Sequence, residues 1–153
     1  MGKMFFLLAL LLSEAAVVRG FYSHGVDFVA AEGIKLRGVL TAPSRRVGSS
    51  YRGVLLIDGS GPNDRDERVP NTPYAPFRVL AEGLTARGFA VLRFDKRTCS
   101  PLNGHAKCHN NIGHINITRM TIDDFSNDAM AALLTGALRA AALTMPLLHR
   151  SSP

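Results

Sequence analysis

The residues with the clearest potential for chemistry lie in Asp58–Glu67 (DGSGPNDRDE), directly after the apolar run Val54–Ile57. Gly59 and Gly61 allow the backbone to turn with positive φ, and a glycine-rich turn after a strand can bind phosphate. A P-loop needs GxxxxGK followed by Ser or Thr, and no lysine follows here. The dinucleotide-binding fingerprint needs a third glycine and an immediate helix, whereas Asp64 stands at that glycine position, with a long loop behind it. The pattern therefore disfavours nucleotide binding.

This stretch and the segment Leu80–Arg97 (LAEGLTARGFAVLRFDKR) resemble the α/β-hydrolases of the dienelactone-hydrolase and serine-aminopeptidase-like group. Enzymes of that group have a GSGP-x-DRD loop, a helix reading LAe-L-a-rG and a strand ending in R-F/Y-D-K-R-G. The resemblance runs from about Val26 to about Leu138. It implies an α/β fold and hydrolysis of a small-molecule ester or amide through a serine nucleophile, with no cofactor. The chain departs from the group after Arg97, where Thr98-Cys99-Ser100 replaces a glycine-rich turn.

The resemblance also implies a role for the glycine-rich turn. In this fold a backbone N–H from the loop after the third strand helps to form the oxyanion hole, which stabilises the charge of a tetrahedral intermediate. Gly59-Ser60-Gly61 occupies that loop, so the Ser60 N–H is the first candidate donor and the Gly61 N–H the second. We interpret the Ser60 hydroxyl as that of an ordinary turn serine, because it does not lie in a G-x-S-x-G sequence.

Charged residues follow this turn and the next strand, where pairs of opposite charges can hold a loop in place. The residues to which we assign this structural role are Asp64, Arg65, Asp66, Asp95 and Arg97, the last two within the charged run Asp95-Lys96-Arg97. Direct contact with a substrate is the alternative role for the same groups.

The sequence lacks the nucleophile of the group that it resembles. A serine hydrolase of this fold needs a serine in G-x-S-x-G, then an acid, then a histidine. The nearest match, Gly48–Arg52 (GSSYR), has Arg52 at the second glycine position and lies in the wrong loop. No nucleophile or acid precedes His149 in the required arrangement. We therefore expect this chain alone to be inactive and to end before the nucleophile turn.

Both cysteines and three histidines lie in an irregular segment, Lys96–Met120; they are Cys99, His105, Cys108, His109 and His114. Their spacing does not fit the paired C-x-x-C and H-x-x-x-H framework of a zinc site. In an exported protein, two cysteines nine positions apart in a loop favour a disulfide, with free thiols and a metal site as alternatives. Asn116 begins an N-glycosylation sequon (NIT), which has meaning in a eukaryotic source and indicates an exposed loop.

The strands that must position these residues follow from the hydrophobic pattern. Val26–Ala31 and Ile34–Thr41 alternate apolar and polar residues on either side of Glu32-Gly33, which predicts an antiparallel hairpin. The unbroken apolar run Val54–Ile57 predicts a strand buried on both faces, and Phe89–Phe94 predicts another strand.

Two helices are predicted, at about 76–87 and 121–140. Pro76 opens the first, and Gly88 suits the left-handed position after its end. Strand, helix and strand then form a βαβ unit, whose crossover we expect to be right-handed. Thr121 caps the second helix, with Asp124 in a variant of the capping box. The expected apolar stripe of the second helix is Ile122, Phe125, Ala129, Ala132 and Leu133.

The first twenty residues differ from the rest of the chain. Lys3 precedes the apolar run Met4–Leu12, and Ser13-Glu14-Ala15 is a small-x-small cleavage pattern. Because the run is too short to span a membrane, residues 1–20 are predicted to be the signal peptide of a secreted or periplasmic protein. An N-terminal membrane anchor flanked by Arg19 is the alternative.

The 153 residues carry a formal net charge of +6 with 46% hydrophobic residues, which argues against a disordered chain. The basic residues are scattered, so we expect a solvated basic surface and no nucleic-acid partner. After signal cleavage no membrane contact is expected.

These observations predict an α/β fold, with the N-terminal half of an α/β-hydrolase domain at 21–142 and an unstructured tail at 143–153. An antiparallel hairpin should lead into a mostly parallel sheet with flanking helices, truncated before the nucleophile turn. Such a half would expose an apolar sheet edge, through which the chain could self-associate. Three hypotheses remain open: a truncated or incomplete form of an ester- or amide-cleaving hydrolase, a secreted non-catalytic binding protein, and a half-enzyme completed by a partner chain.

Overall fold

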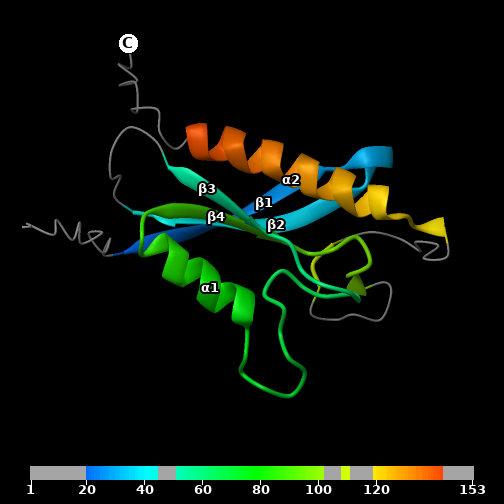
Figure 1. Ribbon diagram of the computed structural model, residues 1–153, viewed down its shortest axis with the longest axis horizontal. Helices are drawn as coiled ribbons and strands as arrows, with labels where there is room; N and C mark the ends of the chain where they lie inside the picture. The colour runs from blue at the N-terminus through cyan, green and yellow to red at the C-terminus, as the bar shows by residue number, and fades with distance from the viewer. Residues whose placement is uncertain (1–19, 45–50, 102–107, 111–118, 143–153) are drawn as a thin grey trace, which may run out of the picture.

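The computed structural model describes residues 20–44, 51–101, 108–110 and 119–142, which form one four-stranded sheet with a helix on each face (Figure 1). The elements in chain order are β1 (Phe21–Val29), η1 (Ala31–Gly33), β2 (Lys35–Pro43), β3 (Arg52–Leu56), α1 (Pro76–Thr85), β4 (Phe89–Phe94) and α2 (Ile122–Ala142). The strand order is β1-β2-β4-β3. The α/β class is therefore found, but the sheet is not mostly parallel in the described residues, because β2 is antiparallel to both of its neighbours and only β3 and β4 are parallel.

The predicted hairpin is confirmed, and its strands are longer than predicted. β1 and β2 pair from Phe21 opposite Pro43 to Val29 opposite Lys35. The connection η1 places Glu32 at φ 59° and Gly33 at φ 74°. Two successive residues with left-handed backbone reverse the chain within a few positions, which explains why a glycine stands there.

The strand, helix and second strand around the glycine-rich loop are confirmed as β3, α1 and β4. Pro76 begins α1, and Gly88 follows the helix with φ 90°. The prediction that Val54–Ile57 is buried on both faces is wrong for the described residues: β3 is half-buried, and Ile57 follows it with 53% exposure. The reason is that β3 forms an edge of the described sheet, so that part of its surface is uncovered.

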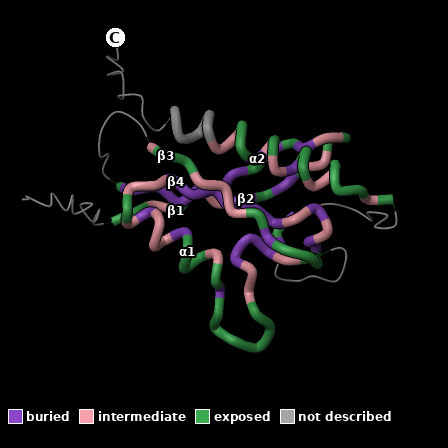
Figure 2. The backbone as a smooth tube through the Cα atoms, in the orientation of Figure 1, coloured by how far each residue is buried: buried purple, intermediate pink, exposed green. Residues whose placement is uncertain are grey.

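The hydrophobic core lies between the sheet and α2, and the buried stretches of the central strands mark it in Figure 2. The rings of Phe28 and Phe94 meet edge to face, with centroids 5.5 Å apart. Ala132 brings α2 onto this cluster. Gly38 lets β2 and β4 approach closely, because a Cβ at that position would lie 2.8 Å from the Arg93 carbonyl oxygen.

The face that α2 buries differs in part from the prediction. Thr121 donates its N–H to Asp124 Oδ2 at 2.8 Å, which is one half of the expected capping box. Ile122 and Leu133 are exposed, Ile122 to 80%, whereas Asp128 and Ala132 are buried. The buried face of the helix therefore includes the Asp128 carboxylate, which pairs with an arginine. In the part of the chain that the structure describes, no helix is long and apolar enough to span a membrane.

Several predicted features lie outside the described residues. They are residues 1–19 of the expected signal peptide, the expected tail 143–153, the sequon at Asn116, and the two histidines His105 and His114.

Candidate functional site

The glycine-rich turn Gly59-Ser60-Gly61 is exposed at the carboxyl end of β3. Gly61 has φ 97°, which is open to glycine and strained for other residues. The turn is fixed through its carbonyl groups: the Lys96 ammonium donates to the Gly59 oxygen, and Asn63 Nδ2 donates to the Ser60 oxygen at 2.9 Å. Within the described residues, the N–H groups of Ser60 and Gly61 donate no hydrogen bond. Two neighbouring backbone donors are thus available to an anion at this end of the sheet.

Asp58 is a buried carboxyl group directly before this turn. Its side chain is 2% exposed, Oδ1 lies 4.0 Å from Lys96 Nζ, and Oδ2 has no hydrogen-bond partner among the described residues. Burial raises the pKa of Asp58 to about 7, although the positive charge of Lys96 opposes this rise. The negative charges of Glu67 and Asp95 raise the pKa further. Asp58 therefore changes its charge near neutral pH.

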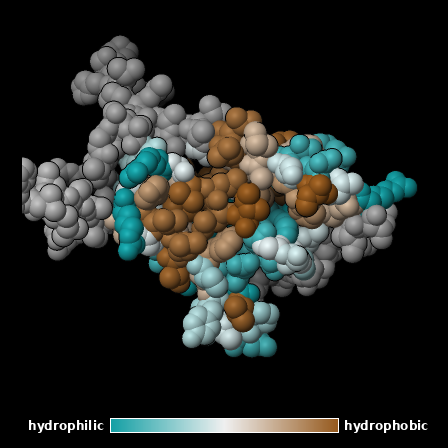
Figure 3. All heavy atoms as spheres, in the orientation of Figure 1, coloured by the Kyte–Doolittle hydropathy of each residue, from teal (hydrophilic) through white to brown (hydrophobic). Residues whose placement is uncertain are grey.

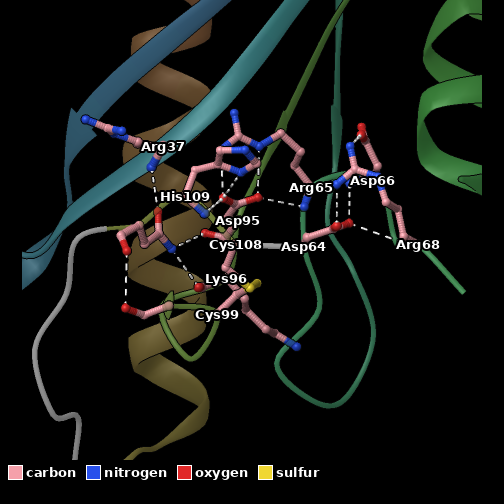
Figure 4. Close-up of a disulfide and its surroundings, with 12 residues drawn as sticks. Arg37, Asp64, Arg65, Asp66, Arg68, Asp95, Lys96, Cys99, Cys108 and His109 are labelled. Carbon is pink, nitrogen blue, oxygen red and sulfur yellow. Dashed lines mark hydrogen bonds and ion pairs between the residues drawn. A yellow bond between two sulfur atoms is a disulfide. The ribbon is translucent and has the colours of Figure 1, made fainter. Parts of the chain in front are cut away.

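Asp95 and Arg65 form the buried ion pair that anchors the loop to the sheet (Figure 4). Arg65 Nε donates to Asp95 Oδ1 at 2.8 Å and its terminal nitrogen to Oδ2 at 2.7 Å, while the Arg65 backbone N–H adds a third bond at 2.8 Å. The same guanidinium donates to the Gly38 carbonyl. Burial acts to raise the pKa of Asp95, but the hydrogen bonds and charge of Arg65 outweigh it, so this pKa lies below its ordinary value.

Asp64 and Asp66 make a second group of ion pairs with two arginines. Asp64 accepts from the backbone N–H groups of Asp66 and Arg68, and its Oδ2 accepts from the Arg68 guanidinium at 2.7 Å. Asp66 bridges Arg68 and Arg93, at 2.6 and 2.8 Å. Arg93 lies on β4, so this group also joins the loop to the sheet.

Arg97 joins the end of β4 to α2 instead of to the loop. It donates two hydrogen bonds of 2.7 Å to the carboxylate of Asp128, and its third nitrogen lies 3.1 Å from Asp124 Oδ1. The hydrogen bond with Asp128 raises the pKa of Arg97 above its ordinary value. This pair accounts for the buried carboxylate on α2.

A disulfide joins Cys99 and Cys108, whose Cα atoms are 5.3 Å apart. The residues after Cys108 return to the Arg65–Asp95 pair: the His109 N–H donates to Asp95 Oδ2 at 2.7 Å, and Asn110 Nδ2 donates to the carbonyls of Asp95 and Lys96. The structure thus places the cysteines where they constrain the loop after β4. Within the described ranges, no cluster of histidine, cysteine and carboxylate side chains is arranged to hold a metal ion.

Four of the five predicted loop residues belong to the two groups of ion pairs that hold the loop after β3; they are Asp64, Arg65, Asp66 and Asp95. Asp58 was not singled out from the sequence, and Lys96 was named only as the middle residue of the charged run Asp95-Lys96-Arg97. The available signal was weak: Asp58 is the first polar residue after an apolar run, and Lys96 stands between two residues that were assigned a role.

No family model matches the chain. It is 41% identical over 63 residues to esterase EstD of Thermotoga maritima, a match that covers 41% of this chain and 14% of the esterase. Its structure is similar to the crystal structure of hypothetical protein PA2218 from Pseudomonas aeruginosa, with a TM-score of 0.51 and 18% identity, over 97% of this chain and 39% of that one. The chain thus matches well under half the length of either protein. These similarities support a hydrolase-like α/β fold.

Proposed function

We propose that this chain forms the N-terminal half of an α/β-hydrolase domain that cleaves ester bonds of small molecules through a serine nucleophile, and that it supplies the oxyanion donors. The observation that carries the proposal is the exposed Ser60–Gly61 turn, whose two N–H groups are unpaired within the described residues. Similarity to an esterase over 63 residues supports an ester as the substrate class.

The topology supports a ligand-binding role for this turn. The crossover from β3 to β4 passes through α1 on one face, and α2 lies on the opposite face (Figure 1). Crossovers between parallel strands are right-handed. Because α2 lies on the opposite face from α1, a right-handed crossover through α2 runs from β4 back toward β3. The next parallel strand would therefore pair with the free edge of β3. The strand order then reverses beside β3, and ligands bind at the carboxyl ends of strands at such a point. The Gly59–Gly61 turn lies at that end of β3.

The chemistry required of the turn is electrostatic. Attack on an ester carbonyl places a negative charge on its oxygen, and N–H donors fixed beforehand stabilise that charge without reorganising during the reaction. Arg65 donates a hydrogen bond to the Gly38 carbonyl on β2, and Asp66 forms an ion pair with Arg93 on β4. Lys96 and Asn63 hold the two carbonyls of the turn. A donor held in this way contributes roughly 10²–10³ in turnover.

The nucleophile belongs to a polypeptide segment that continues this sheet, since none of the serines in these 153 residues lies in G-x-S-x-G. In this proposal the chain by itself does not turn over esters. The N-terminal signal pattern supports export of the protein, which N-terminal sequencing of the mature form would test.

The test replaces Ser60 in a form of the protein that carries the nucleophile. Ser60→Pro removes the N–H and should lower kcat for a p-nitrophenyl ester by roughly 10²–10³-fold. Ser60→Ala keeps the N–H and is the matched control, which should retain most of the activity. Equal activity of the proline variant and the unmodified protein, at equal folded fraction by circular dichroism, would show that Ser60 is not the donor.

A further inference from the structure

The peptide group between Gly59 and Ser60 links Lys96 to the candidate donor. A trans peptide is planar, so its C=O and N–H point in opposite directions, and the described residues contain no cis peptide. The Lys96 ammonium donates to the Gly59 carbonyl oxygen. That contact fixes the plane of the peptide and therefore turns the Ser60 N–H away from Lys96.

Lys96 is itself held by groups from two other elements. Its side chain is only 12% exposed and extends toward the loop after β3, away from the Arg65–Asp95 pair (Figure 4). Nζ lies 5.1 Å from the ring centroid of Phe125 on α2 and 4.0 Å from Asp58 Oδ1. A lysine fixed by a ring, a carboxylate and a backbone carbonyl has little freedom to release the peptide that it holds.

We propose that Lys96 is a positioning residue that aims the Ser60 N–H at the oxyanion, and that Asp58 anchors the Lys96 ammonium in this position. The inference rests on the proposed function for the role of the N–H, but the geometry that it asserts can be measured without any substrate. It also gives a role to the buried carboxyl group of Asp58, one oxygen of which has no partner among the described residues.

The arrangement should respond to pH near neutrality, because the charge of Asp58 changes at about pH 7. The charged groups that face Asp58 are Lys96, Glu67 and Asp95. When Asp58 is ionised it attracts the ammonium, and when it is protonated that attraction is lost. The orientation of the Gly59–Ser60 peptide should therefore be better defined above pH 7 than below it.

The experiment records the backbone amide of Ser60 by ¹H–¹⁵N NMR in the 153-residue chain from pH 5 to pH 9. The unmodified chain should show a step in the Ser60 shift with a midpoint near pH 7. Asp58→Asn should remove the step. Lys96→Met should move its midpoint to higher pH and reduce its size, because the positive charge that opposes the raised pKa of Asp58 and orients the peptide is lost, and Lys96→Arg should restore both. Lys35→Met is the matched control, because Lys35 is an exposed lysine on β2 and its loss should leave the step unchanged.

Core amides, such as that of Leu36, report whether each variant is folded. If Lys96→Met does not fold, the titrations of the unmodified chain and of Asp58→Asn still decide the question. A Ser60 amide that does not titrate near pH 7, or a step that persists in Asp58→Asn, overturns the proposal.

A kinetic measurement in a nucleophile-bearing form separates this inference from the proposed function. Lys96→Met should lower kcat by roughly 10–10²-fold with little change in KM. A donor that points in the wrong direction stabilises the transition state less, and it affects the binding of the substrate only a little. If the NMR step is found but neither Lys96→Met nor Ser60→Pro changes the kinetics, the positioning geometry is supported and the oxyanion function is rejected. If Ser60→Pro lowers kcat but the NMR step is absent, the oxyanion function is supported and the positioning role of Lys96 is rejected.

Discussion

Asp58 shows how a single residue can couple the candidate site to pH. Its carboxyl group is buried at the carboxyl end of β3, and its pKa of about 7 lies well above the ordinary value of 3.8. Between these two pH values the folded state keeps a proton that the unfolded state releases, so the free energy of unfolding falls as the pH rises from about 4 to 7. Above pH 7 Asp58 is ionised in both states, so the free energy of unfolding falls no further on its account.

Asp58→Asn should remove this loss, because an amide does not ionise. Relative to the unmodified chain, the free energy of unfolding of the variant should rise by roughly 2–4 kcal/mol between pH 4 and pH 8. Urea unfolding at the two pH values measures the change. Parallel behaviour of the two proteins would show that Asp58 is not a buried carboxyl group with a raised pKa.

Only some site residues could be predicted from the sequence. Ser60 and the charged residues after it stand out because glycine-rich turns and alternating charges are local patterns. Asp58 and Lys96 gain their importance from each other, 38 positions apart in the chain and 4.0 Å apart in space. No local pattern carries that proximity.

At the scale of elements, buried ion pairs hold the loop after β3 against the sheet. Arg65 reaches from the loop to Asp95 at the end of β4, and Asp95 is fully buried. Arg37 and Asp27 form an ion pair on the hairpin, but their side chains are 53% and 70% exposed. The two pairs allow a matched comparison, since removing one partner of a buried pair leaves an uncompensated charge and removing one of an exposed pair does not.

Arg65→Met should lower the free energy of unfolding by about 3–5 kcal/mol at pH 7, and Arg37→Met should change it by less than about 1 kcal/mol. Denaturant unfolding of the two variants in the same buffer provides the measurement. Similar small losses in both would mean that the Arg65–Asp95 pair does not anchor the loop.

The elements themselves were largely predictable, and their burial was not. The hairpin, the βαβ unit and the beginning of α1 follow from alternation, apolar runs and Pro76, which act within a few residues. The buried face of α2 was predicted from its apolar residues. In the structure Asp128 is buried in an ion pair with Arg97, and Ile122 is exposed. The ion pair between Arg97, in the segment after β4, and Asp128 on α2 favours that orientation, and hydrophobic periodicity does not detect it.

For the whole molecule, the uncovered apolar surface agrees with the proposed half-domain. Apolar side chains gather over the sheet beside β3 (Figure 3). The exposed large apolar residues include Ile57 after β3, Leu80 on α1 and Leu134 on α2. A further strand on the free edge of β3 would cover such a surface, whereas an uncovered edge invites self-association.

The most direct test of the central claim is the identity of the reactive serine in the native protein. The protein would be isolated from its source with an antibody to this chain, treated with a fluorophosphonate probe, and analysed by intact mass after reduction and deglycosylation. The proposal predicts a labelled polypeptide heavier than the 16.5 kDa of this chain, with the probe on a serine outside these 153 residues. An unlabelled protein of 16.5 kDa or less, or a probe on a serine within this sequence, would contradict it.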